Sequence, residues 1–388
     1  MANKPRIRFR GFTEDWEQCK LGDLYKRVNE RNDGTLGRDK WISVAKMYFQ
    51  DPDKVQSNNL DTRTYVMKKG DIAFEGHPNN EFKFGRFVLN DIGTGIISEL
   101  FPIYRPITEY DLDFWKYAIQ LERVMAPIFA KSITSSGNSS NKLDHNHFLN
   151  QELLVPNIEE QKKIGTLLSL LSKNITLHQH KLKKLNLAKK ALLQKLFPRN
   201  GSQFPVVRFK GFTDAWEQRK LSDITEVIMG QSPSSKNYTD NPNDNILVQG
   251  NADLKDGKVI PRLWTKEITK TIDKDGIILT VRAPVGDVAK TDYKVVLGRG
   301  VAGIKGNDYI YHFLQKLQNN QYWVSLSSGS TFESINSNDI KDLIIDIPSI
   351  EEQTKISILL NNVNSIITLH QQEPFLCGNS VNGGVELC

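Results

Sequence analysis

Few residues of this chain have the types and spacing that covalent chemistry requires. Gly298-Arg-Gly-Val-Ala-Gly303 fits the glycine pattern of a dinucleotide-binding turn, but the next helix signal comes only at 307–316. A helix should open within such a turn, so the pattern favours a strand–turn–strand. Asp144-His145-Asn146-His147 could suggest a metal pair, yet its counterpart in an internal repeat, 336–339, has no histidine. We therefore expect no catalytic residues and no metal site.

Loops between predicted strands carry side chains that can bond phosphates and base edges. For any one of these residues, a solvated loop position is the alternative. In the first half of the chain we predict DNA contacts for Lys46, Tyr48, His77, Asn79, Asn80, Lys83, Arg86, Ser136, Asn138 and Lys142. In the second half the set is Gln231, Ser232, Ser234, Ser235, Lys236, Tyr238, Gln249, Asn251, Arg262, Trp264, Arg282, Arg299, Ser328 and Thr331.

An internal repeat organises the sequence. Residues 5–24 recur at 205–224 with twelve of 20 positions identical, and residues 156–179 recur at 348–371 with fourteen of 24 identical. The long stretches between these segments barely match. We interpret the chain as a duplicated scaffold with two divergent inserts that perform different versions of one task. Simple drift of the two copies is the alternative.

The second matched segment of each copy predicts a helix with a coiled-coil seam. Glutamates at 159–160 and 351–352 place negative charge in the first turn, and Phe197-Pro198 ends the first helix. Apolar residues follow at alternating spacings of four and three. A helix of some 39 residues would form a rod on the order of 58 Å. The predicted seam is Ile164, Leu168, Leu171, Ile175, Leu182, Leu185, Leu192 and Leu196, with Ile356, Leu360, Val363 and Ile367 in the second copy.

The second helix begins in the same register but should end sooner. Pro374 would break a helix interior, so we expect the helix to stop at about residue 372. Neither helix can bury its seam alone, and we expect the two to pair in an antiparallel coiled coil. Docking on its own domain or on another subunit is the alternative for each. We expect His178 and His370, which share one seam position, to set the register and to bind no metal.

The composition is that of a globular protein and argues against a membrane-spanning chain. Of the 388 residues 39% are hydrophobic and 25% charged, which is ordinary for a globular protein. We expect no transmembrane helix or signal peptide, and three cysteines fit a reducing cytoplasm. No Gly-x4-Gly-Lys-Ser/Thr phosphate loop occurs. The net charge of +6 hints only weakly at nucleic acid, but residues 161–200 hold ten lysines and arginines and no acidic residue.

The pattern resembles the specificity subunit of a type I restriction-modification enzyme. The features that carry the resemblance are the lead motifs ending Trp16-Glu-Gln and Trp216-Glu-Gln, the Pro-x-Ile-Glu-Glu-Gln-x-Lys-Ile helix starts at 156 and 348, and Gly-Gln-Ser-Pro233. The resemblance covers residues 5 to about 372. It implies an α+β fold: two mixed α/β target recognition domains joined by long helices in an antiparallel coiled coil, with a pseudo-two-fold repeat.

The resemblance also implies a domain plan. Residues 1–150 would form the first target recognition domain with its lead motif, and 151–204 a central helical spacer. Residues 205–347 would form the second recognition domain and 348–372 a short distal helix. Residues 373–388 look foreign to the plan, so we expect weaker assembly with one modification subunit, or pairing with another copy.

In that family each recognition domain reads one half of a bipartite, asymmetric DNA target, and the chain itself is not an enzyme. The resemblance implies double-stranded DNA as a partner, two modification subunits that methylate adenine with S-adenosylmethionine, and two restriction subunits that use ATP and Mg2+. This chain would bind no cofactor. The alternatives are an enzyme with an unrecognised nuclease or methyltransferase site, or an inactive allele that serves only as a coiled-coil scaffold.

Overall fold

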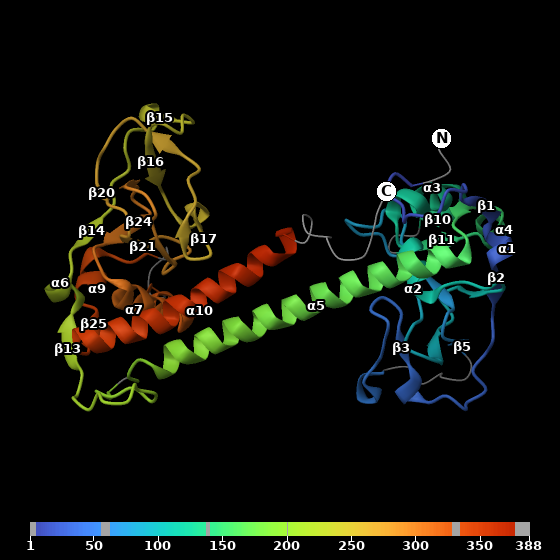
Figure 1. Cartoon of the computed structure of the whole chain (residues 1–388), viewed down its shortest axis with the longest axis horizontal. Coiled ribbons are helices and arrows are strands. Elements are labelled where there is room, and N and C mark those ends of the chain that lie inside the picture. The colour runs from blue at the N-terminus through green and yellow to red at the C-terminus, as the bar shows by residue number, and fades with distance from the viewer. Residues whose placement is uncertain (1–4, 56–62, 137–139, 200, 328–333, 377–388) are drawn as a thin grey trace. The chain divides into compact units, whose positions relative to one another are not determined.

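A computed structural model describes residues 5–55, 63–136, 140–199, 201–327 and 334–376. The chain divides into two compact units, Met1–Leu177 and His178–Leu376, which we call unit 1 and unit 2 (Figure 1). No helix of the described residues is long and apolar enough to cross a membrane.

Unit 1 is built on a four-stranded antiparallel sheet in the order β2-β9-β6-β7. Phe74, Phe87 and Tyr104 on these strands pack against Phe129 and Phe148 of the covering helices. The sheet strands are β2 (Tyr25–Val28), β6 (Ile72–Glu75), β7 (Arg86–Leu89) and β9 (Ile103–Pro106). The other elements are α1 (Leu21–Leu24), β3 (Ile42–Ser43), β4 (Tyr48–Phe49), β5 (Thr64–Met67), β8 (Gly95–Ser98), α2 (Leu112–Ala118), α3 (Glu122–Ser132), β10 (Ile133–Ser136), β11 (Asn141–Leu143) and α4 (His145–Leu149).

Unit 2 repeats this core in the order β14-β24-β21-β22 and extends it with β18 and β17. Arg27 faces Tyr104 in unit 1 and Val227 faces Ile304 in unit 2, so the strand register is the same at an offset of 200. The six strands are β14 (Val227–Met229), β17 (Leu254–Lys255), β18 (Lys258–Val259), β21 (Ile277–Thr280), β22 (Val288–Lys290) and β24 (Val301–Ile304). The two inserts therefore share one core sheet although their sequences barely match.

A second sheet, four short α-helices and two 3-10 turns complete the described part of unit 2. This sheet has the order β15-β19-β16-β23-β20. Its strands are β15 (Tyr238–Thr239), β16 (Asn245–Val248), β19 (Trp264–Thr265), β20 (Thr271–Ile272) and β23 (Val295–Leu297). The helices are α6 (Leu221–Ile224), α7 (Asp308–Asn319), α8 (Tyr322–Ser327) and α9 (Ser337–Lys341), and the 3-10 turns are Ser235–Asn237 and Asn251–Asp253. The glycine-rich segment 298–303 connects β23 to β24, as the strand–turn–strand interpretation predicts.

The lead motif of each copy pairs with the strand just before the long helix. In unit 1, β1 (Glu17–Lys20) is antiparallel to β12 (Glu152–Val155). In unit 2, β13 (Glu217–Lys220) pairs in the same way with β25 (Ile344–Ile347). The matching segments 5–24 and 205–224 thus close each unit, because their strand pairs with the last strand before the long helix.

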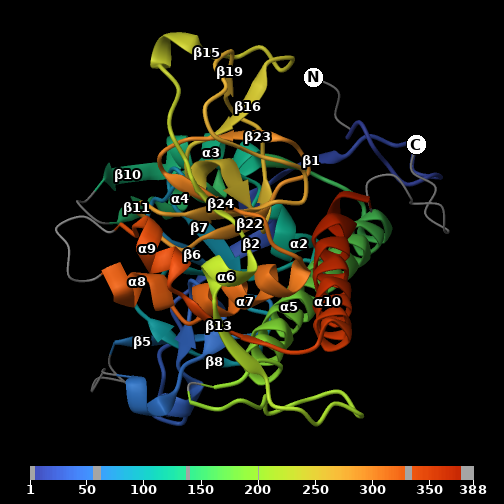
Figure 2. The ribbon, with the colours of Figure 1, turned by 90° about the vertical axis from the view of Figure 1, so that its left-hand side faces the viewer.

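Two long helices follow these strands. α5 (Ile158–Lys195) has 38 residues and contributes to both units, and α10 (Ile350–Leu376) belongs to unit 2. The unit 2 part of α5 lies antiparallel to α10 (Figure 1 and Figure 2), and the His178 and His370 ring centroids are 6.3 Å apart. The predicted α+β fold with an antiparallel coiled coil and an internal repeat is confirmed.

Burial along α5 follows the heptad where α10 covers it. From 178 to 192, only His178, Leu182, Leu185, Lys189 and Leu192 are partly buried, and every other residue is exposed. On α10, Ile356, Leu360 and Ile367 are buried and Val363 is partly buried. In the unit 1 part of α5, Ile164 and Leu168 are partly buried, whereas Leu171 and Ile175 are exposed.

Two helix boundaries differ from the sequence predictions. α10 continues to Leu376, beyond the expected end near residue 372. A proline removes one backbone donor, and in the last turn that loss does not end the helix. The sequence of residues 114–122 also favours a helical piece, but in the structure α2 ends at Ala118 and α3 begins at Glu122. Asp111 caps α2 by accepting a hydrogen bond from the Phe114 amide at 2.8 Å.

Unit 2 should lose stability as the pH falls, because it buries a neutral histidine. His312 is fully buried, with Nε2 2.9 Å from Asn361 Oδ1 and Nδ1 3.2 Å from Gln315 Oε1. Burial lowers its pKa; the two hydrogen bonds and Asp308 oppose this effect, and Lys189 adds to it. Below about pH 6.5 the His312 imidazole therefore binds a proton in the unfolded chain but stays neutral in the folded chain, until the pH falls below its lowered pKa.

We therefore expect the free energy of unfolding of unit 2 to decrease from pH 7.5 to pH 5.5, by at most about 1.4 kcal/mol per pH unit for this one proton. His312→Gln should flatten that slope in urea unfolding curves. His147→Gln is the control, because the His147 side chain is 63% exposed in the folded chain. An unchanged slope in His312→Gln would contradict the assignment.

Candidate nucleic-acid interface

Each unit is fastened to its long helix by an ion pair between the lead motif and the first helical turn. Arg8 Nε and Nη2 donate to the two carboxylate oxygens of Glu160, both at 2.7 Å. Arg208 forms the same bidentate pair with Glu352 at 2.8 and 2.9 Å. Trp216 Nε1 also donates to Glu352 at 3.2 Å. Both carboxylates are buried, so these pairs fix where each unit sits on the start of its helix.

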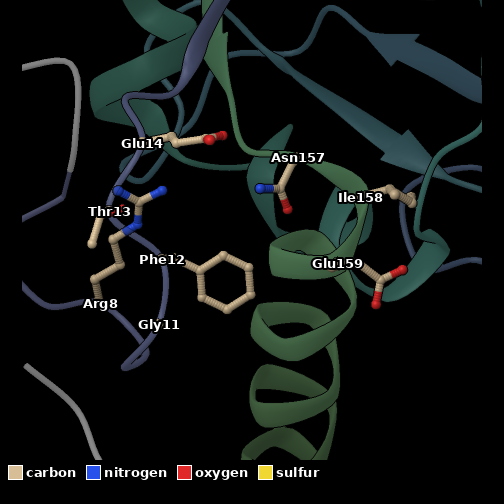
Figure 3. A pocket seen from close by; sticks show the side chains of 8 residues that line it. All are labelled: Arg8, Gly11, Phe12, Thr13, Glu14, Asn157, Ile158 and Glu159. Carbon is tan, nitrogen blue, oxygen red and sulfur yellow. The ribbon is translucent and has the colours of Figure 1, made fainter.

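Neighbouring residues of the lead motif complete this attachment. Figure 3 shows Arg8, Phe12, Asn157 and Glu159 around the first turn of α5. Asn157 Oδ1 accepts from the Glu160 amide at 2.9 Å and caps the helix. The Lys163 ammonium lies 4.9 Å from the Phe12 ring centroid, and Lys355 lies 4.7 Å from Phe212 in the same arrangement. The repeated residues thus position the inserts.

In unit 2, the predicted DNA-contacting loops meet at one place. Ser232 Oγ accepts from the Arg299 amide at 3.1 Å, and Gln249 Nε2 donates to the Tyr238 hydroxyl at 2.8 Å. The Val281 amide donates to Gly300 at 2.9 Å, which brings Arg282 beside the same loop. We call the loops 230–238, 248–251, 281–287 and 298–300 the unit 2 loop cluster.

Glycines allow the unit 2 loop cluster to pack this closely. A Cβ added at Gly230 would collide with the Gly298 carbonyl, and one at Gly300 would collide with the Gln249 carbonyl. The glycine pattern at 298–303 therefore serves close backbone approach between loops. Two carboxylates hold the loops from within. Asp253 accepts from the Gln249 amide at 2.7 Å, and Glu267 accepts from the Ser234 amide at 2.8 Å, which helps to lower the pKa of Glu267.

The arginines of this cluster are presented to solvent. Arg282 and Arg299 are exposed, and within the described residues neither forms an ion pair. Ser234, Ser235, Lys236 and Gln231 are also exposed. A guanidinium free of a carboxylate can offer two parallel donors to guanine or to a phosphate. The unit 2 loop cluster is therefore a suitable surface for a nucleic-acid groove.

Unit 1 gathers its predicted residues around β6, β7 and β11. The Asn141 amide donates to Gly76 at 2.8 Å, and its side-chain amide donates to Phe84 at 3.1 Å. Arg86 Nη2 donates to the Ala45 carbonyl at 2.6 Å, which ties the 44–49 loop to the same place. We call the loops 44–49, 76–86 and 140–142 the unit 1 loop cluster. Of the residues predicted to contact DNA, those exposed in this cluster are Lys46, Tyr48, His77, Asn79, Asn80, Lys83 and Lys142.

His77 and Arg282 occupy equivalent positions in the two units. In unit 1 the Asn141 amide donates to Gly76, and in unit 2 the Ile335 amide donates to Val281 at 3.0 Å. The next residue, His77 or Arg282, follows the end of the matching core strand, β6 or β21. One position of the shared core therefore presents an imidazole in one unit and a guanidinium in the other.

Several predicted residues use their polar groups within the loops. Arg86 donates to Glu75 at 3.0 Å, Arg262 to the Ala252 carbonyl at 2.8 Å, and Asn251 to Asp287. Trp264 is partly buried in β19. Asn138, Ser328 and Thr331 lie outside the described residues, as does the side chain of Ser136. The contacts between these residues and DNA stay a prediction.

The Asp144–His147 motif, which could suggest a metal pair, forms a helix cap in the structure. No group of three or more His, Cys, Asp or Glu residues among the described residues could hold a metal ion. Asp144 instead caps α4 by accepting from the His147 amide at 2.8 Å, and Asn336 caps α9 at the matching place. His145 lies 2.6 Å from the Tyr104 hydroxyl, and burial lowers its pKa. The polar-turn interpretation of this motif agrees with these contacts.

Sequence reasoning missed the residues that position the site. The Arg8–Glu160 and Arg208–Glu352 pairs were not predicted, although all four residues lie at matched positions of the repeat. Identity of both an arginine and a glutamate in the two copies was the available signal. Asp253 and Glu267 carry no repeat signal, because the inserts differ.

Comparison with known proteins identifies the fold. Residues 213–375 match the model of the type I restriction modification DNA specificity domain. The chain is 26% identical over 394 residues to the "Putative type I restriction enzyme MjaX specificity subunit" of Methanocaldococcus jannaschii, covering 93% of this chain and 89% of that protein. It is 30% identical over 166 residues to the type I restriction enzyme MjaIX specificity subunit of the same organism, covering 39% of this chain and 38% of that protein.

Solved structures show the same fold. The type I restriction-modification S subunit from M. genitalium aligns with a TM-score of 0.59 at 14% identity, covering 92% of both chains. A chain from a study of complex assembly and conformational transition of the type I R-M system aligns with a TM-score of 0.57 at 22% identity, again over 92% of both chains.

The fold, with its duplicated core and long helices, is therefore the fold of a type I restriction-modification S subunit. Residues 213–375 match the type I restriction modification DNA specificity domain, and 93% of the chain is similar to a putative type I specificity subunit.

Proposed function

We propose that each unit reads one half of a bipartite, asymmetric DNA sequence. The observation that supports this is one core sheet, built twice in the same register, that presents different side chains at equivalent loop positions. Two readers with the same shape and different contact residues suit two half-sites of different sequence. α5, which is continuous from unit 1 into unit 2, would fix the gap between the halves.

In this proposal the chain also positions partner subunits on the DNA. The relatives are named specificity subunits of type I restriction enzymes, and one similar chain comes from a type I R-M assembly. Two modification subunits would methylate adenine with S-adenosylmethionine, and two restriction subunits would use ATP and Mg2+. This chain would supply recognition and geometry, and no group to either reaction.

Methylome sequencing of cells that express this chain with a modification subunit tests the proposal. We expect a gapped, two-part methylated motif. Exchange of residues 225–340 for the same region of a related chain should change one half of the motif and leave the other half and the gap unchanged. Exchange of residues 25–150 is the matched control and should change only the other half. A motif without a gap, or a change in both halves from one exchange, would refute it.

A further inference from the structure

Unit 1 carries an apolar groove of about 530 Å³ between the lead segment, α2, α3 and the first turns of α5. Trp16, Tyr117, Leu121, Ile164 and Leu168 line it, and Arg8 and Gln120 stand at its border. Leu121 is 42% exposed in the folded chain. A concave apolar surface with a few polar groups at its edge is the form of a protein-binding site.

The equivalent groove of unit 2 is filled by the end of α5. Leu193, Leu196 and Phe197 are at most 2% exposed there. The Phe197 ring centroid lies 6.4 Å from that of Trp216 and 5.9 Å from that of Phe313. Lys316 Nζ donates to the Pro198 carbonyl at 2.8 Å, three residues beyond the end of α5. The unit 2 site therefore contacts both apolar side chains and the backbone that follows the helix.

Five apolar residues of the unit 1 groove have apolar counterparts in unit 2. The N-caps Asp111 and Asn307, each accepting from the amide three residues on, align α2 with α7. The matching pairs are Trp16 with Trp216, Tyr117 with Phe313, Leu121 with Leu317, Ile164 with Ile356 and Leu168 with Leu360. Size and apolar character are kept at every pair, so the unit 1 groove suits the same kind of ligand.

Groups that are satisfied in unit 2 are left without partners in unit 1. Trp216 is 1% exposed and donates to Glu352, whereas Trp16 is only partly buried and its Nε1 has no hydrogen-bond partner among the described residues. Arg8 Nη1 is also buried without a described partner. Along α5 the apolar stripe continues from the groove through Leu171 and Ile175, and Ile175 is 55% exposed where its counterpart Ile367 is 8% exposed.

We propose that the unit 1 groove binds, in trans, an amphipathic helix from a second polypeptide built on this plan, with an ending like that of residues 192–198. A second copy of this chain is a poor donor, because its own Leu193, Leu196 and Phe197 fill its unit 2 core. Residues 384–388 do not repeat the apolar residues of this ending. At the offset of 192 that relates the two helices, Leu192, Leu193 and Leu196 correspond to Gly384, Val385 and Cys388.

A peptide of residues 178–199 is the probe for this groove. We expect the labelled peptide to bind the full chain saturably at one site in fluorescence anisotropy. The same peptide with Leu196→Ala and Phe197→Ala should bind at least 10-fold more weakly. Leu121→Lys in the chain should also weaken binding at least 10-fold. Leu100→Lys, at an exposed leucine outside the groove, is the matched control and should leave binding unchanged.

Three outcomes would overturn the proposal. Equal binding of both peptides, or of a scrambled peptide of the same charge, would reduce the interaction to electrostatic attraction. A 10-fold gain in affinity on deletion of residues 377–388 would assign the groove to the chain's own C-terminal residues. A dimer of this chain that Leu121→Lys dissociates in sedimentation would assign it to a second copy. None of these readouts depends on DNA recognition.

Discussion

Replacing Glu352 with alanine is expected to destabilise unit 2 by about 3–5 kcal/mol, a factor on the order of 10² to 10³ in its folding equilibrium. Glu352 is 1% exposed and accepts both arms of the Arg208 guanidinium and the Trp216 indole N–H. Alanine would leave a buried cation and a buried indole donor without partners. The free-energy cost comes from leaving the Arg208 guanidinium and the Trp216 N–H buried without an acceptor, because an intact buried ion pair adds little net stability.

The adjacent residue supplies a matched control for this experiment. Glu351 pairs with Lys355 at 2.9 Å, but its side chain is 71% exposed. Glu351→Ala should therefore change the free energy of unfolding by less than about 1 kcal/mol. Urea unfolding followed by tryptophan fluorescence measures both variants, and hydrogen exchange of β13 and α10 would locate the loss in unit 2. Equal effects of the two substitutions would contradict a structural role for the Arg208–Glu352 pair.

Features set by local spacing could be predicted from the sequence, whereas contacts between residues far apart in the chain could not. The duplication and the heptad at 178–192 are patterns of composition at fixed spacing, and local spacing determines a helix face. The Arg8–Glu160 pair joins residues 152 positions apart, so only the folded chain brings it together. Its signal was present in the repeat, where both partners are identical in the two copies, but repeats alone do not say which residues touch.

The core shared by the inserts could not be predicted, for a different reason. The interior of a β-sheet requires apolar side chains at alternate positions, and several apolar residues meet that requirement. Phe74 and Phe87 in unit 1 therefore have Leu279 and Val288 at the same positions of unit 2. Sequence identity is lost while register is kept. The loop clusters depend in addition on close backbone contacts, such as Gly300 against Gln249, which fold only as a group. Loop residues could thus be named as candidates, but their grouping required the structure.

Removal of the two exposed arginines of the unit 2 loop cluster is expected to have the largest effect on DNA binding. A bidentate contact from arginine to a base contributes about 1–3 kcal/mol of discrimination. Arg282→Ala with Arg299→Ala should therefore weaken binding to the methylated target by roughly 10²-fold or more if both contact bases. Lys258→Ala is the control, because Lys258 is an exposed cation of the same unit that already pairs with Asp292 at 2.7 Å.

The salt dependence and the methylome then separate two roles for each arginine. A phosphate contact would weaken binding to all sequences alike and lower the salt slope by about one, whereas a base contact would relax one position of one half-site. Because His77 holds the position in unit 1 that Arg282 holds in unit 2, we expect single substitutions at the two sites to relax opposite halves of the motif. Relaxation of the same half by both substitutions, or unchanged affinity in the double variant, would exclude these loops as the readers. A shared core that carries different side chains at one position is how two units of the same fold could come to read different bases.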